Sequence, residues 1–365
     1  MKISSFTKRT LCALLSAGLL FAASCTEKPK DHAICGYDTE GKHMDQACMT
    51  EGMYSFFLSQ KKSEFLPVLV LNYKDFSGEY DELWGLTAPD GKTYEEHFSQ
   101  IALEDAKKIV AANMVLYENF VPQQAYIDLI SSTVENHAIE KYGSVMSFEQ
   151  YLETFGTTYE DYEKLYLLTW NKETLKESLF GDEVGVMQVP DASIKQYYAD
   201  NYYTVEHIFI TTAYQEKIDG TRAPISDAES ARRKATAAEI YELVNNGASL
   251  SDIAEKYPND YVVVYPNTSA MDSTGETTNA PELGEALKQM EIGDVRSVDS
   301  TFGVHILKRV ETNPENYNKS TTIVETIRTK LEEASFEEIL ATYSQKVTVD
   351  DDIVSLHTLA ASPMP

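Results

Sequence analysis

The feature that most limits the fold is a change in hydrophobic periodicity along the chain. From about residue 50 to residue 181, apolar residues recur every three or four positions, as in amphipathic helices. From residue 204 the apolar residues alternate, as in the strand-like TVEHIFIT at 204–211, and helical spacing returns after residue 313. We therefore expect an α+β protein: a mainly helical domain interrupted by an inserted α+β domain.

The first helical domain is predicted to cover residues 49–190. Thr158 followed by Asp161 resembles a capping box, which indicates a helix start. Long helices are expected at 94–117, 123–142 and 158–180. The many aromatic side chains fit a hydrophobic core by default, and a binding crevice is the less common alternative.

Residues 313–365 are predicted to form a C-terminal helix and tail that pack on this helical domain. An apolar stripe runs along residues 313–345: Ile323, Ile327, Leu331, Phe336, Ile339, Leu340 and Tyr343. Exposing such a stripe costs roughly 25 cal/mol per Å² of apolar surface. We therefore expect residues 313–345 to pack on the first helical domain rather than on the inserted one.

The inserted domain, residues 204–311, is expected to have the order β-α-α-α-β-β. Three cap signals mark its helices: Ser226 with Glu229, Ser249 with Asp252, and Asn279 with Glu282. A turn at Gly293–Asp294 and the strand VHILKRVE at 304–311 complete it.

The N-terminal 24 residues are predicted to be an export signal. Lys2, Lys8 and Arg9 precede an apolar run from 11 to 21, which is too short for a permanent membrane span. The small residues 22–24 before Cys25 resemble the bacterial lipobox, in which the cysteine is acylated and becomes the first mature residue. The alternative is an ordinary secretory signal that contains a cysteine. Either interpretation places the protein outside the cytoplasm, and the first attaches it by lipid to the outer side of the cytoplasmic membrane or within the periplasm.

Residues 25–48 are interpreted as a tether followed by a small loop. An exported pair of cysteines thirteen positions apart, Cys35 and Cys48, is typical of a disulfide. No CxxC or paired Cys/His spacing indicates a metal site, and we expect neither metal nor cofactor.

The charge of the chain excludes some partners. Without residues 1–24 it has 28 Lys and Arg against 58 Asp and Glu, a net charge near −30. Nucleic-acid binding needs a basic face, so we exclude it. The acidic surface suits basic or apolar clients, or it serves only solubility.

Four segments of the inserted domain carry a family resemblance. These are HIFI at 207–210, LVNNGASLSDIAEKYPND at 243–260, PELGEALKQMEIGDV at 281–295, and STFGVHILKRVE at 300–311. They resemble the parvulin (PpiC-like) family of peptidyl-prolyl isomerases. Helical segments on both sides make the arrangement similar to the exported PrsA- and SurA-like foldases and chaperones.

The resemblance implies a set of site residues. His207 and His305 match the two histidines that sit back to back, Asp260 matches a Cys or Asp position, and Ser300 matches a Thr or Ser position. Leu283 stands where the family has a proline-contacting Phe, and Asn279 where it has a Met. The family's glycine-rich block is replaced by NTSAMDSTGETT. The alternative for His207 and His305 is a hydrogen-bonded pair with a purely structural role.

Three functions remain open from the sequence. The first is a foldase that binds unfolded exported polypeptides and isomerises X–Pro bonds. The second is a holdase whose parvulin domain does not catalyse, and the third is a structural envelope lipoprotein. The oligomeric state also stays open, and a homodimer is one alternative.

Overall fold

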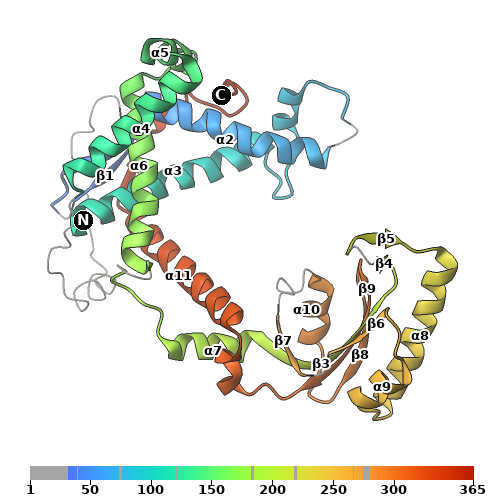
Figure 1. Cartoon of the computed structure of the whole chain (residues 1–365). Helices are drawn as coiled ribbons and strands as arrows, with labels where there is room; N and C mark the ends of the chain where they lie inside the picture. The colour runs from blue at the N-terminus through green and yellow to red at the C-terminus, as the bar shows by residue number, and fades with distance from the viewer. Residues whose placement is uncertain are drawn as a thin grey trace. The chain divides into compact units, whose positions relative to one another are not determined.

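The computed structural model describes residues 32–365 except 39, 74–75, 121, 182–184, 218–219, 266 and 274–279. The chain forms two compact units, and the expected α+β fold class is confirmed (Figure 1). Of the described residues, those from His32 to Gln188 together with Glu332–Pro365 form unit 1, and those of Val189–Leu331 form unit 2. Cys25 and the signal segment lie outside the described residues. None of the described helices has the length and apolar character needed to cross a membrane.

Unit 1 is built mainly from helices. They are α2 (Glu51–Asn72), η1 (Tyr80–Gly85), α3 (Tyr94–Asn119), α4 (Gln124–Tyr142), α5 (Val145–Glu153) and α6 (Tyr159–Phe180). Side-chain caps start four of these helices, since Thr50, Thr93, Ser144 and Thr158 accept hydrogen bonds from backbone N–H groups of the first turn. One apolar core joins these helices, with Trp84, Tyr54 and other fully buried side chains inside it.

From His32 onward, a small sheet in unit 1 replaces the irregular loop that was predicted before residue 49; residues 25–31 of the predicted tether lie outside the described residues. Strands β1 (His32–Tyr37) and β2 (His43–Thr50) pair with each other, and β10 (Val347–Val349) pairs with β1 on its other side. Cys35 and Cys48 lie opposite each other in the two strands and are joined by a disulfide. The pairing with β10 joins segments about 310 residues apart, which no local sequence pattern reveals.

Helix α11 (Thr321–Ser344) corrects a second prediction. Its C-terminal half packs in the core of unit 1 through Phe336, Ile339, Leu340 and Tyr343. Its N-terminal half packs instead in unit 2, where Ile327 is buried with side chains of α7 (Asp191–Asn201). The prediction that all of 313–345 packs on the helical domain is therefore wrong for the first half. Two short helices complete the C-terminal segment. The 3₁₀ helix η3 (Pro314–Lys319) precedes α11, and α12 (Asp351–Val354) follows β10.

Unit 2 contains an antiparallel sheet with the strand order β6-β3-β9-β8, and β7 also pairs with β3. The strands are β3 (Tyr202–Thr211), β6 (Val262–Val264), β7 (Ser269–Asp272), β8 (Val295–Asp299) and β9 (Gly303–Val310). A separate hairpin consists of β4 (Tyr214–Glu216) and β5 (Arg222–Pro224). The order of elements predicted from the sequence lacked strands β4 to β7, because strands of three or four residues are too short to show alternation.

The two faces of this sheet pack on different helices. Ile208, Ile210, Val304 and Ile306 form a core with α8 (Asp227–Asn245) and α9 (Leu250–Lys256). On the other face, Val205 and Leu307 pack with Leu283 and Leu287 of α10 (Pro281–Lys288). Helix α10 begins at Pro281 after Ala280, which provides no side-chain cap, and the predicted cap Asn279 lies outside the described residues.

Candidate functional site

Strand alternation and register bring the predicted histidines together on the α10 face of the sheet. His207 and Phe209 share one face of β3, because side chains two positions apart point the same way. Phe209 lies opposite His305 in the β3–β9 pairing, and His207 lies opposite Leu307. His207 and His305 are therefore diagonal neighbours across two antiparallel strands.

The two imidazoles are hydrogen-bonded to each other, and a serine hydroxyl adds a second hydrogen bond to one of them. Nε2 of His207 lies 3.0 Å from Nδ1 of His305, and Oγ of Ser300 lies 3.0 Å from Nε2 of His305. Ser300 also holds the turn between β8 and β9, because its Oγ accepts hydrogen bonds from the N–H groups of Phe302 and Gly303. Ser300 therefore orients His305, and His305 orients His207.

Both histidines are neutral at neutral pH. Burial, followed by the nearby His305, lowers the pKa of His207 to about 3. Burial also lowers the pKa of His305 to about 4, although the carboxylate of Glu282 opposes this shift. Each ring then carries one N–H, so one ring can donate to the other while its partner accepts. The pair is a fixed, uncharged polar group in an apolar surface.

Aromatic rings flank the pair on both sides. The ring of Tyr265 stacks on His207 with centroids 4.6 Å apart, and the ring of Phe209 lies 4.7 Å from that of His305. The backbone N–H of Tyr265 donates to the carbonyl of His207, which continues the β3–β6 pairing. Tyr265 is 38% exposed and Val263, opposite Phe209, is 40% exposed. The site thus presents apolar surface next to two neutral histidines.

Sequence reasoning missed Tyr265 and Val263. Their segment reads YVVVY, and only three of its residues form β6. Phe209 could have been found, because its alternation with His207 predicts that both side chains lie on one face of the strand. The positions of Tyr265 and Val263 could not, because they depend on an edge strand that pairs with a strand more than fifty residues earlier in the sequence.

The structure places the other predicted residues in different environments. Asp260 is exposed and lines a cavity of about 200 Å³ together with Phe209, which touches His305. Leu283 is only 1% exposed and packs in the core with Val205 and Leu307. Leu283 therefore packs within the core beneath the histidine-bearing face of the sheet and contributes no exposed surface to the site.

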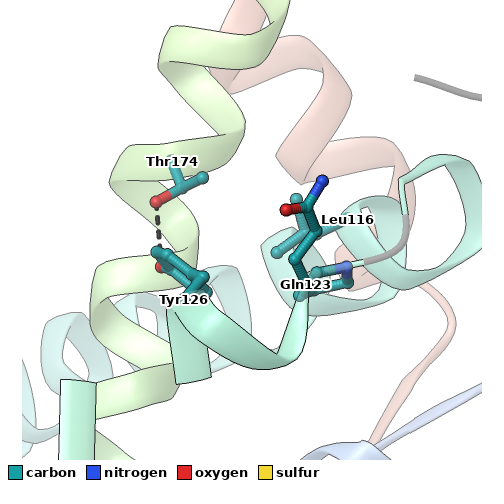
Figure 2. A pocket seen from close by; sticks show the side chains of 5 residues that line it. Leu116, Gln123, Tyr126 and Thr174 are labelled. Carbon is teal, nitrogen blue, oxygen red and sulfur yellow. Dashed lines mark hydrogen bonds between the residues drawn. The ribbon is translucent and has the colours of Figure 1, made fainter. Parts of the chain in front are cut away.

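Unit 1 has a small apolar cavity of its own. It has a volume of about 120 Å³ and is lined by Leu116, Pro122, Gln123, Tyr126 and Thr174 (Figure 2). The hydroxyl of Tyr126 is held by Asn171 and by Oγ1 of Thr174, at 3.1 and 3.0 Å. Large apolar side chains are also exposed on the helices of this unit, among them Leu129, Met146 and Trp170.

One group of side chains has the composition of a metal site. Nitrogen and sulfur atoms of His32, Cys35 and Cys48 lie within 4.8 Å of one another. Both cysteines belong to the disulfide, and a metal binds the free thiolate rather than a disulfide sulfur. The group is therefore not a metal centre in this structure.

Comparison with known proteins agrees with the geometry of unit 2. Residues 193–313 match the family model of the PPIC-type PPIase domain. No curated protein matches the chain. Three solved structures are similar to it. The peptidylprolyl isomerase PrsA from Bacillus anthracis is 19% identical, with 66% of this chain and 95% of that chain covered and a TM-score of 0.24. PrsA from Bacillus subtilis is 17% identical (75% of this chain and 98% of that chain covered, TM-score 0.22), and the foldase protein PrsA from Streptococcus pneumoniae is 14% identical (74% of this chain and 97% of that chain covered, TM-score 0.25). With the match at 193–313 and the paired histidines on one face of its sheet, this segment belongs to the parvulin-type family of peptidyl-prolyl isomerase domains.

Proposed function

We propose that the protein is an extracytoplasmic foldase. Unit 2 isomerises X–Pro bonds in exported polypeptides, and unit 1 holds those polypeptides while they are unfolded. The observation that carries the isomerase proposal is the neutral His207–His305 pair, which lies beside the exposed ring of Tyr265 and the half-buried ring of Phe209.

The chemistry requires no nucleophile. Rotation about an X–Pro bond is opposed by amide resonance, with a barrier of about 18–20 kcal/mol. The planar amide is the more charge-separated state, so an apolar surface with few charges stabilises it less than water does. Tyr265, Val263 and Phe209 supply that apolar surface for the proline ring. The uncharged histidines and Ser300 keep its geometry fixed without a charge that would stabilise the planar amide.

A protease-coupled assay on short X–Pro peptides tests the isomerase proposal. We expect His207→Ala and His305→Ala to lower kcat/KM by at least tenfold. Ser300→Ala should lower it less, and Ser300→Thr should restore it because threonine keeps the hydroxyl. His43→Ala in unit 1 is the matched control and should change nothing. A wild-type protein without isomerase activity would contradict the proposal.

A holdase function is supported by a different observation. Unit 1 exposes large apolar side chains such as Leu129, Met146 and Trp170, which can contact unfolded segments without reading their sequence. We expect the double variant His207→Ala/His305→Ala to suppress aggregation of an unfolded client as well as the wild type does. Equal loss of both activities in that variant would show that one site performs both functions.

We further propose that Cys25 is acylated and attaches the protein to the outer side of a membrane. The support is the run of small residues at 22–24 directly before Cys25. Mass spectrometry of the mature N-terminus should find a lipid on Cys25, and Cys25→Ala should release unlipidated protein. Cys12→Ser, within the signal segment, is the control and should stay membrane-bound. A Cys25→Ala protein that remained firmly attached would contradict the proposal.

A further inference from the structure

The cavity beside the histidine pair contains a buried arginine that the isomerase site does not use. Phe209 joins the two places, because its ring contacts His305 and also lines the cavity. Other lining residues are Thr211, Tyr214, Arg233, Asp260 and Tyr261. The cavity measures about 200 Å³. An engineered apolar cavity of about 150 Å³ holds a benzene molecule, so this one has room for one large side chain.

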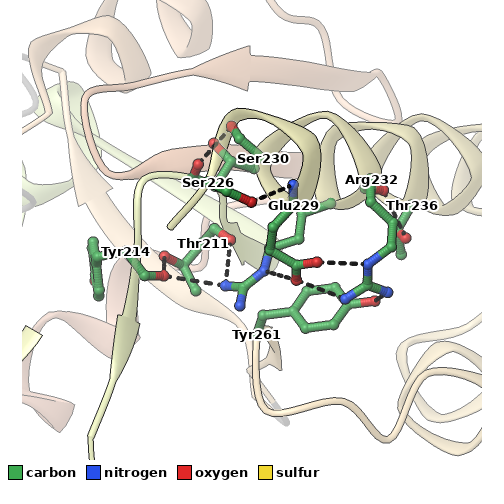
Figure 3. Close-up of polar contacts among 10 residues, drawn as sticks. Thr211, Tyr214, Ser226, Glu229, Ser230, Arg232, Thr236 and Tyr261 are labelled. Atoms are coloured by element: carbon green, nitrogen blue, oxygen red, sulfur yellow. Dashed lines mark hydrogen bonds and ion pairs between the residues drawn. The ribbon is translucent and has the colours of Figure 1, made fainter. Parts of the chain in front are cut away.

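The guanidinium of Arg233 is held rigidly. Its Nε donates to Glu229 at 2.8 Å, and its Nη1 donates to the carbonyls of Thr211 and Tyr214, both at 3.1 Å (Figure 3). The group also lies over the ring of Tyr261, 4.6 Å from its centroid. Arg232 and Arg233 together lower the pKa of Glu229 to about 2, so this carboxylate stays ionised at any ordinary pH.

One terminal nitrogen of Arg233 remains available. Arg233 is 4% exposed, and its Nη2 has no hydrogen-bond acceptor among the residues that the structure describes. Among the described residues, this nitrogen is not one of the fully enclosed side-chain atoms that lack a partner, so it keeps access to solvent. A guanidinium N–H in that position can donate to an acceptor that enters the cavity. Since Arg233 lines the cavity, a molecule bound there can supply the acceptor.

The charged side chains that line the cavity favour an uncharged occupant. Asp260 and Glu216 are exposed lining residues and repel an acidic side chain, while the guanidinium repels a basic one. Phe209 and Tyr261 favour apolar surface. The acceptor that every polypeptide carries is the backbone carbonyl.

We propose that this cavity binds an uncharged residue next to the client's proline, and that Nη2 of Arg233 donates a hydrogen bond to a backbone carbonyl of the client there. Arg233 is then a residue that sets the register of the client on the isomerase face. The inference rests on the proposed function, because it states how the parvulin site holds its polypeptide.

Arg232 provides a matched control within the same cluster. It also pairs with Glu229, at 2.7 Å, and its Nη1 donates to the hydroxyl of Tyr261. Its side chain is 57% exposed, and it does not line the cavity. A lysine at either position keeps the positive charge beside Glu229 but lacks the second terminal nitrogen.

The test uses the full chain and capped X–Pro peptides in which one carbonyl at a time is replaced by a thioamide, a weaker acceptor. Peptide binding is measured by fluorescence or NMR titration, and isomerisation is measured separately. We expect Arg233→Lys to weaken binding of the unmodified peptide about tenfold, the effect of one hydrogen bond to a charged donor. One thioamide position should weaken binding to the wild type and have no further effect on Arg233→Lys. Arg232→Lys should behave as the wild type.

Val263→Trp covers the case in which Arg233→Lys does not fold, because it narrows the cavity without touching Glu229. It should weaken binding by a similar factor. The inference is overturned if Arg233→Lys, or Val263→Trp in its place, binds peptide as the wild type does. It is also overturned if the folded Arg233→Lys variant still discriminates against the same thioamide, or if the wild type binds no peptide. Binding without isomerisation would contradict the isomerase proposal and leave this inference standing.

Discussion

At the residue scale, the state of the site is set by two histidines that cannot easily become charged. Burial lowers the pKa of both His207 and His305 well below the ordinary value of 6.5. The groups that face them are the carboxylate of Glu282, the hydroxyl of Ser300 and the rings of Tyr265 and Phe209. Of these, Glu282 alone favours a charged imidazole, and its effect does not offset burial.

This predicts a dependence of stability on pH. In the unfolded chain both histidines gain protons as the pH falls below about 6.5, whereas the folded pair gains them only near pH 3 to 4. The stabilising contribution is therefore complete above pH 6.5 and decreases as the pH falls from 6.5 toward 4.

Chemical denaturation of unit 2 at pH 7.5 and pH 4.5, followed by NMR, measures the effect. Carboxylates also titrate in this range, so the readout is the difference from the double variant His207→Gln/His305→Gln. We expect the variant to lose less stability than the wild type on acidification. Equal losses in the two proteins would show that the histidines titrate normally in the folded state.

At the scale of elements, α11 contributes to two separate cores. Ile327 is fully buried with Ile194 and Tyr198 in unit 2, and Leu340 is fully buried in the core of unit 1. The apolar stripe read from the sequence predicted a single partner for the whole helix. A helix of 24 residues spans about 36 Å, which is enough to reach two different cores along its length.

We therefore predict that substitutions at the two ends of α11 act on different units. Ile327→Ala and Leu340→Ala should each cost about 2–5 kcal/mol, because each leaves a cavity in a packed core. Hydrogen exchange should show faster exchange in α7 and β3 for Ile327→Ala, and in α3 and α6 for Leu340→Ala. Glu325→Ala on the same helix is the exposed control. Faster exchange confined to unit 1 in the Ile327→Ala variant would contradict the assignment.

At the scale of the whole molecule, the main feature is a strongly acidic surface. The net charge of the full sequence is −27, and most acidic side chains lie at the surface. Such a surface attracts basic polypeptides over a distance that shortens as salt is added, and it keeps loaded complexes soluble. If unit 1 acts as the proposed holdase, charge rather than one shaped groove would select the clients that reach its exposed apolar side chains.

This predicts that client binding depends on salt according to client charge. Suppression of aggregation of a basic unfolded client should weaken severalfold between 50 and 500 mM NaCl, because the attraction is screened. An acidic client should show the opposite trend or none. Light scattering with both clients measures the effect. The same salt response for both clients would mean that net charge plays no part in client binding.

The sequence by itself determined the elements whose pattern is local. Helical spacing predicted the long helices α3, α4 and α6 of unit 1, and the caps at Thr158, Ser226 and Ser249 marked helix starts as the structure has them. Alternation along β3 also placed His207 and Phe209 on one face. These features depend on neighbours within a few residues, so they can be read from the chain directly.

Only the tertiary structure decided what depends on distant pairing. His305 lies beside His207 because β9 pairs with β3 in one register, and a shift of one residue would turn its ring to the opposite face. Tyr265 reaches His207 through a strand of three residues, too short to show a pattern. The pairing of β1 with β10 and the division of α11 between two cores likewise depend on burial of surfaces that lie far apart in sequence. Periodicity shows which side of an element is apolar, but the segment that covers that side is selected only when the whole chain folds.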